Sequence, residues 1–150
     1  MTLDDLRHAN LEALEDIYAS DRAVEVPTGC FRGVYLKTID SEEAHRLGNR
    51  VMARGGFGIA PFGVDFDARL WWFGLCRARI GRFEPVVGSS RWRQANVLGL
   101  HYDVSRLPRF VRRHLYDEVK PLEAGLCLGI GGLNRPDGQG ALFYFALARC

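Results

Sequence analysis

The pattern of turn-forming residues changes near Phe57, and this change constrains the fold more than any other feature of the sequence. From there to the C-terminus, short apolar runs are separated by Gly, Pro, Asp and Ser. A spacing of about 8–16 residues between such runs is typical of an antiparallel barrel or sandwich rather than of βαβ units. The predicted strands are Leu70–Phe73, Phe83–Val87, Arg91–Tyr102, Phe110–Leu122, Leu126–Leu133 and Ala141–Ala148.

The first third of the chain shows helical periodicity instead. Apolar residues recur at helical spacing over residues 3–19, after a Thr2 that can cap the first turn. A second helix is predicted over residues 41–54. Between the helices, Cys30–Ile39 is rich in β-branched and aromatic residues and predicts a strand. The 150 residues are therefore expected to form one mainly β domain, α+β by content, with a barrel or strongly curved sheet and two N-terminal helices.

The charge balance limits the classes of partner. Twenty basic and 18 acidic residues give a net charge of +2, which produces no long-range field of the kind expected for a nucleic-acid partner. No apolar stretch approaches the length of a membrane span. The sequence leaves the oligomeric state open.

The cysteines and histidines do not form a metal-binding pattern. Cys30, Cys76, Cys127 and Cys150 are widely spaced, and no two histidines have the spacing of a ligand pair. We therefore expect neither a metal nor another cofactor. The N-terminus is acidic and polar, unlike a signal peptide. These features predict a cytoplasmic protein with four reduced thiols.

The segment from Arg91 to Tyr102 carries the most information about a site. Strand alternation places large apolar groups and two amides, Gln94 and Asn96, on one face. Buried amides need several hydrogen-bond partners, which a cavity with water or a polar ligand would supply. The alternative is that the two amides lie near an open end of the sheet. The residues predicted to face inward are Trp92, Gln94, Asn96, Leu98, Leu100 and Tyr102, and the face with Val97 and His101 is predicted to be wetter.

The next predicted strand carries two charged residues among apolar neighbours. Arg113 and Asp117 share the face of Leu115 and Val119 and lie about 13 Å apart along a strand, too far to pair with each other. Either residue could orient a ligand, or each could pair with a neighbouring strand. The opposite face is predicted to be solvated and comprises Arg112, His114, Tyr116, Glu118 and Lys120.

Gly29-Cys30-Phe31-Arg32-Gly33 resembles the Gly-x-Trp-x-Gly motif of a small family of bacterial domains, with Phe in place of Trp. The later segments 116–119, 125–129 and 143–147 look similar to the strands that end those domains. The resemblance implies a lipocalin-like, or calycin-like, β-barrel with a ligand cavity.

These observations favour binding of a small hydrophobic molecule, such as a lipid, with one polar end inside a barrel cavity. One alternative is a cyclase or isomerase acting on a natural-product intermediate in the same cavity, and whether the protein is an enzyme stays open. Another is a protein-interaction module that uses a sheet edge. The predicted ligand-binding residues are Phe31, Trp72, Trp92, Gln94, Asn96, Tyr102, Arg113, Asp117 and Tyr144.

Overall fold

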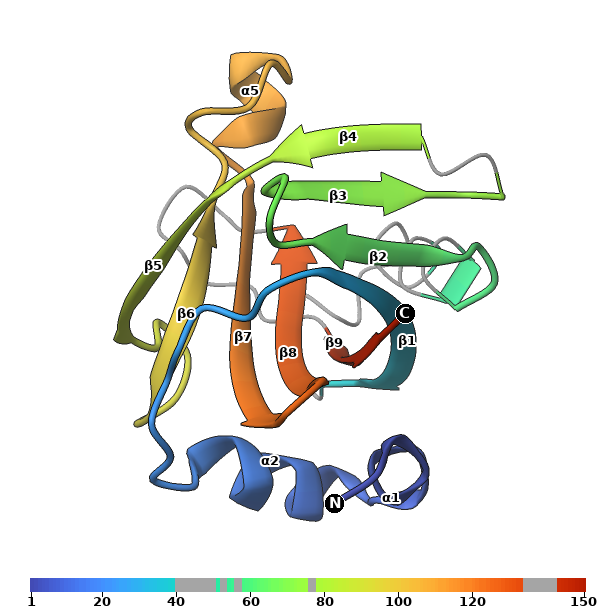
Figure 1. The fold of residues 1–150 in the computed structure, drawn as a ribbon, viewed down its shortest axis with the longest axis vertical. Coiled ribbons are helices and arrows are strands. Elements are labelled where there is room, and N and C mark those ends of the chain that lie inside the picture. Colours follow the sequence, from blue (N-terminus) through green and yellow to red (C-terminus); the bar gives the residue numbers. More distant parts are fainter. Residues whose placement is uncertain (40–50, 52–53, 56–57, 76–77, 134–142) are drawn as a thin grey trace.

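A computed structural model describes residues 1–39, 51, 54–55, 58–75, 78–133 and 143–150. Nine antiparallel strands form one sheet in the order β4-β3-β2-β1-β9-β8-β7-β6-β5, which confirms the predicted mainly β, barrel-like fold (Figure 1). The predicted helix over residues 41–54 falls almost entirely outside the described residues. The strands are β1 Cys30–Thr38, β2 Phe62–Asp65, β3 Leu70–Phe73, β4 Ala78–Arg82, β5 Glu84–Ser89, β6 Asn96–His101, β7 Leu115–Glu123, β8 Leu126–Leu133 and β9 Phe143–Arg149.

The sheet curls into a nearly closed barrel. The edge strands β4 and β5 are consecutive in sequence and only Phe83 separates them. The chain therefore passes directly from one edge strand of the sheet to the other (Figure 1). Phe83 is fully buried and packs in the interior beside Phe66 and Tyr102. Burial of so large an aromatic side chain at the junction stabilises the closed form.

Strand alternation separates an interior core from an outer core. The interior core contains one face of every strand from β6 to β9 together with residues of β1, β2 and β3. The outer core lies between the opposite face of β6, β7, β8 and β9 and the N-terminal helices. The fully buried interior residues include Phe31, Phe62, Leu98, Leu100, Val119 and Phe145.

The N-terminal segment forms two helices rather than the single helix predicted over residues 3–19. These are α1 (Leu3–His8) and α2 (Leu11–Ala19). Asn10 ends the first helix because its side chain accepts a hydrogen bond from the Ala13 backbone N–H at 2.8 Å and caps α2. Leu6, Leu14 and Tyr18 are fully buried against the outer face of the barrel (Figure 1).

The predicted strand Arg91–Tyr102 is shorter in the structure and begins at Asn96. The Ser90 hydroxyl accepts hydrogen bonds from the backbone N–H groups of Trp92 and Arg93 at 3.0 and 2.9 Å. This local alternative to strand pairing folds residues 90–95 into the β5–β6 connection. Alternation counted through this loop therefore gives wrong orientations before Asn96.

The predicted strand Phe110–Leu122 is also shorter, because its first residues belong to the short helix α5 (Arg109–Arg112). Pro108 precedes the helix, where its fixed backbone angle is tolerated. Strand β7 begins only at Leu115. The sequence patterns miss β2 and β4, whereas the predicted bounds of β3 and β8 agree with the structure.

The expectation of four reduced thiols is wrong for two of them. Cys30 and Cys150 form a disulfide that joins the start of β1 to the residue after β9. The two cysteines are 120 residues apart in sequence, but β1 and β9 are paired neighbours, so sequence spacing alone gives no sign of the bond. Cys127 is a buried free thiol, and Cys76 lies outside the described residues.

Candidate ligand-binding site at one end of the barrel

Three of the predicted site residues lie in the barrel interior. Phe31, on β1, is 1% exposed, and Tyr102, just after β6, is 4% exposed. Asp117, on β7, is half-buried and accepts a hydrogen bond from the Tyr102 hydroxyl. Alternation along β6 and β7 thus predicts correctly that Tyr102 and Asp117 share the interior face.

The Tyr102–Asp117 pair forms a polar group within an apolar core. Burial raises the pKa of the Tyr102 phenol well above its usual value, and the neighbouring negative charge of Asp117 raises it further. The phenol therefore keeps its proton and serves as a hydrogen-bond donor. Gly131, opposite Asp117 on β8, leaves the space for the carboxylate, since a Cβ there would lie 2.8 Å from Asp117 Oδ1.

Aromatic rings fill the centre of the barrel. Phe145 packs edge to face against Phe62 and Trp71, with ring centroids 6.4 and 5.8 Å apart. Gly129 on β8 makes room for this ring, because a Cβ there would lie 2.2 Å from the ring of Phe145. Gly33, in the motif of β1, makes room for Phe62 in the same way. The motif thus places Phe31 inside the barrel and leaves space for a neighbouring ring.

A pocket opens at the end of the sheet where β1 and β8 begin and β7 and β9 end. We call it the mouth pocket. Its volume is about 670 Å³, which is within the usual range for small-molecule sites. Interior residues Phe31 and Cys127 line it, together with the β7–β8 turn and the segment that links α2 to β1. The remaining lining residues are Arg22, Ala23, Glu25, Val26, Pro27, Thr28, Pro121, Leu122, Glu123, Ala124, Gly125 and Arg149.

The charged residues of the mouth pocket differ in their protein partners. Arg149 donates one hydrogen bond to the Thr28 carbonyl at 3.0 Å, and its guanidinium lies 6.0 Å from the centre of the Phe31 ring. Arg22 donates to the Leu122 carbonyl at 2.7 Å. Glu123 forms an ion pair with the N-terminal amine at 2.8 Å. Because a guanidinium has five N–H groups, both arginines keep donors that can reach a polar ligand group.

Cys127 is a buried free cysteine that lines the mouth pocket. Burial raises its pKa to about 12, so it stays protonated at neutral pH. In this state it behaves as a small apolar group.

Three other predicted aromatic site residues lie outside the barrel interior. Trp72, on β3, lines a surface pocket beside α1. Trp92 packs against Tyr116, with ring centroids 5.3 Å apart, and Tyr144 packs against Tyr18 of α2. These rings belong to the outer surface and outer core, so the structure does not bring them together with Phe31.

The predicted burial of Gln94 and Asn96 is wrong. Both residues are exposed, since Gln94 lies in the β5–β6 loop and Asn96 is the first residue of β6. The alternative that the two amides lie at an open end of the sheet is the one observed. Arg113 is likewise exposed, because it follows α5 rather than lying within a strand.

The predicted solvated face of β7 is buried instead. Glu118 and Lys120 are 0% and 1% exposed, because α2 and the β5–β6 loop cover this face. Glu118 accepts hydrogen bonds from the hydroxyls of Tyr18 and Ser90 at 2.9 and 2.5 Å, and from the Arg91 backbone N–H at 2.6 Å. Lys120 donates to the Ser20 carbonyl. The face is therefore a satisfied polar layer rather than a solvated surface.

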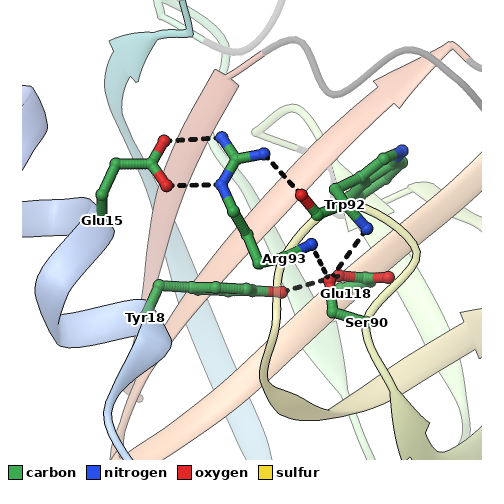
Figure 2. A network of polar contacts seen from close by, with 6 residues as sticks. All are labelled: Glu15, Tyr18, Ser90, Trp92, Arg93 and Glu118. Carbon is green, nitrogen blue, oxygen red and sulfur yellow. Dashed lines mark hydrogen bonds and ion pairs between the residues drawn. The ribbon is translucent and has the colours of Figure 1, made fainter.

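An ion pair extends this polar network, as Figure 2 shows. Arg93 binds the carboxylate of Glu15 with two N–H groups, one of them at 2.6 Å. This bidentate pair fastens the β5–β6 loop to α2. Because every group of the network already has a protein partner, we assign it to structure rather than to ligand binding.

Sequence reasoning misses the mouth pocket. Its residues come from the α2–β1 segment, β1, the β7–β8 turn and the end of β9. Only the pairing of β1 with β9 and of β7 with β8 brings these segments together. The Gly-x-Phe-x-Gly motif is the one local sequence signal that points to a residue of this pocket, Phe31.

The described residues contain neither a candidate metal site nor a helix that could cross a membrane. No cluster of three His, Cys, Asp or Glu residues there could hold a metal ion. None of the described helices is long and apolar enough to cross a membrane.

Comparison with known proteins supports the fold and goes no further. No protein-family model matches the chain, and no curated protein matches it. A crystal structure of a protein from Thermomonospora curvata matches with a TM-score of 0.55 and 15% sequence identity, over 99% of this chain and 93% of the other. At this identity the likeness concerns the fold alone.

Proposed function

We propose that the protein binds a small hydrophobic molecule with one polar end, and that the molecule sits in the mouth pocket. The observation that carries the proposal is that this pocket of about 670 Å³ is lined by two residues of the apolar interior, Phe31 and Cys127. A pocket with an apolar floor and a few polar groups at its rim is the usual form of a small-molecule site. The apolar part of the ligand packs on Phe31, and its polar end meets the guanidinium of Arg149.

The location of the site differs from the sequence-based hypothesis. Aromatic rings occupy the centre of the barrel, so the ligand enters one end rather than filling the interior. The Tyr102–Asp117 pair lies beyond these rings and supports the packing there. The cytoplasmic location stays a prediction, since disulfides such as Cys30–Cys150 are more common in oxidising compartments.

Native mass spectrometry of protein purified from its own host tests this proposal. We expect a co-purifying small molecule whose release leaves the protein mass unchanged. A bound species that is purely polar, such as a sugar or a nucleotide, would contradict the proposal.

A further inference from the structure

Arginines gather on the face formed by β4, the β6–β7 connection and α5. Residues of β4 and of segment 104–107 line one shallow pocket of about 360 Å³, and α5 follows directly in the chain (Figure 1). We call this surface the α5 face. Its exposed arginines are Arg79, Arg82, Arg106, Arg109 and Arg113, and Arg112 is partly buried.

Few acidic groups oppose these arginines. Within the described segments 78–82 and 103–113, Asp103 is the one acidic residue. Glu84, just beyond β4, is held in a two-bond ion pair with Arg69 at 2.7 and 2.8 Å. Arg112 donates a hydrogen bond to the backbone carbonyl of Asp103 at 2.5 Å, and the Asp103 carboxylate takes no part in this bond. The α5 face therefore carries a local positive charge much larger than the net charge of +2 for the whole chain.

Exposed apolar side chains stand among the arginines. Phe110 in α5 is 66% exposed, Val104 is 50% exposed and Ile80 on β4 is 49% exposed. Together these three side chains give the surface apolar groups that can enter the boundary of a lipid layer. The α5 face thus combines positive charge with protruding apolar groups.

We propose that the α5 face docks on a membrane surface that contains anionic lipids. Each arginine near such a surface gains electrostatic attraction to lipid headgroups, and Phe110 enters the boundary between headgroups and acyl chains. The protein lies on the surface and does not span it. The site is separate from the mouth pocket and uses none of its lining residues.

The apolar groups favour a lipid surface over nucleic acid. Arginines can also contact the phosphates of a nucleic-acid backbone, but such contacts leave the aliphatic side chains of Ile80 and Val104 in water. A lipid headgroup layer accepts both kinds of group at once. We therefore assign the α5 face to lipid, and binding to a duplex oligonucleotide serves as a test of the alternative.

Co-sedimentation of the full chain with vesicles tests the proposal. We expect binding to vesicles of phosphatidylcholine mixed with phosphatidylserine, and much weaker binding to phosphatidylcholine alone. Binding to the anionic vesicles falls steeply in about 1 M salt, where the screening length shrinks to about 3 Å.

A matched pair of double variants locates the surface. Arg109→Gln with Arg113→Gln removes two exposed arginines of the α5 face and is expected to weaken binding about 25-fold, about fivefold for each arginine. Arg7→Gln with Arg32→Gln makes the same change of charge on α1 and β1, and the affinity for the anionic vesicles is expected to change by less than about twofold. Phe110→Ser is expected to weaken binding about tenfold through lost apolar contact.

Four results would overturn the proposal: no binding to either vesicle, equal binding to both, equal loss in the two double variants, or tighter binding to a duplex oligonucleotide than to the anionic vesicles. An unchanged unfolding midpoint in each variant shows that the compared proteins are folded. Because none of these measurements involves the mouth pocket, the proposal can fail while the proposed function stands.

Discussion

Glu118 is the residue whose surroundings differ most from the sequence-based expectation. Its side chain is fully buried and accepts three hydrogen bonds from α2 and the β5–β6 loop. A buried carboxylate with all its partners in place fixes the position of the segments that donate to it. Tyr18, Ser90 and the backbone of Arg91 are held together in this way.

Replacing Glu118 by Ala is expected to lower the free energy of unfolding by about 2–4 kcal/mol, because it leaves buried donors without an acceptor. Urea denaturation followed by tryptophan fluorescence measures the change. Glu12→Ala, at an exposed position of α2, is the control and should stay within about 0.5 kcal/mol of the original protein. Equal effects of the two changes would show that the network around Glu118 does not stabilise the fold.

The buried tyrosines predict how stability depends on pH. Burial is the main cause that raises the pKa of Tyr18, Tyr102, Tyr116 and Tyr144 above the usual value for tyrosine, and neighbouring carboxylates add to it. The unfolded chain loses these protons near pH 10, whereas the folded chain keeps them. The stabilisation is therefore complete below about pH 10 and is lost as the pH rises above that value.

Urea midpoints at about pH 9 and about pH 11 are expected to show this loss. Tyr18→Phe removes one of the four groups, so the fall in stability should be smaller in this variant. A stability that is constant across this range would mean that the phenols titrate normally and are not buried as described.

At the scale of elements, sequence reasoning succeeded where a strand continues without interruption. Alternation placed Leu98, Leu100 and Tyr102 inside the barrel, as observed. It failed at Gln94, because the Ser90 hydroxyl folds the chain into a loop before the strand begins. Asn96 is exposed because it is the first residue of β6. It failed again at Glu118 because polarity alone cannot reveal that α2, about 100 residues earlier in the chain, covers that face of β7.

The pairing of β1 with β9 also carries the Cys30–Cys150 disulfide. A bond that closes so long a loop restricts the unfolded chain, and its reduction is expected to cost about 2–4 kcal/mol of stability. Non-reducing peptide mapping should recover the Cys30–Cys150 pair. Cys127 should react with a thiol reagent only after denaturation, because its thiol is buried and its pKa is raised to about 12.

Recovery of Cys30 and Cys150 as reduced thiols from freshly purified, denatured protein would contradict this disulfide. Reduced thiols are the state expected in the cytoplasm. Rapid labelling of Cys127 in the folded protein would contradict its burial.

At the scale of the whole molecule, the barrel has a packed centre, and the mouth pocket reaches the interior residues Phe31 and Cys127. The fold class could be predicted from the sequence, because short apolar runs separated by turn residues are a local pattern typical of antiparallel strands. The mouth pocket could not, since its residues come from separate segments. Among the predicted site residues, Phe31 alone lines this pocket.

A fluorescence titration with N-phenyl-1-naphthylamine, a neutral hydrophobic probe with one polar group, tests ligand binding in the mouth pocket directly. Ala124 is an exposed residue of the β7–β8 turn that lines the mouth pocket, so Ala124→Trp narrows the pocket without entering the core. Binding in the mouth pocket is expected to be saturable and to be weakened about tenfold by Ala124→Trp, equivalent to about 1.4 kcal/mol. Ala78→Trp, at an exposed position of β4, is expected to leave it unchanged. Absence of saturable binding, or equal binding by all three proteins, would contradict ligand binding in the mouth pocket.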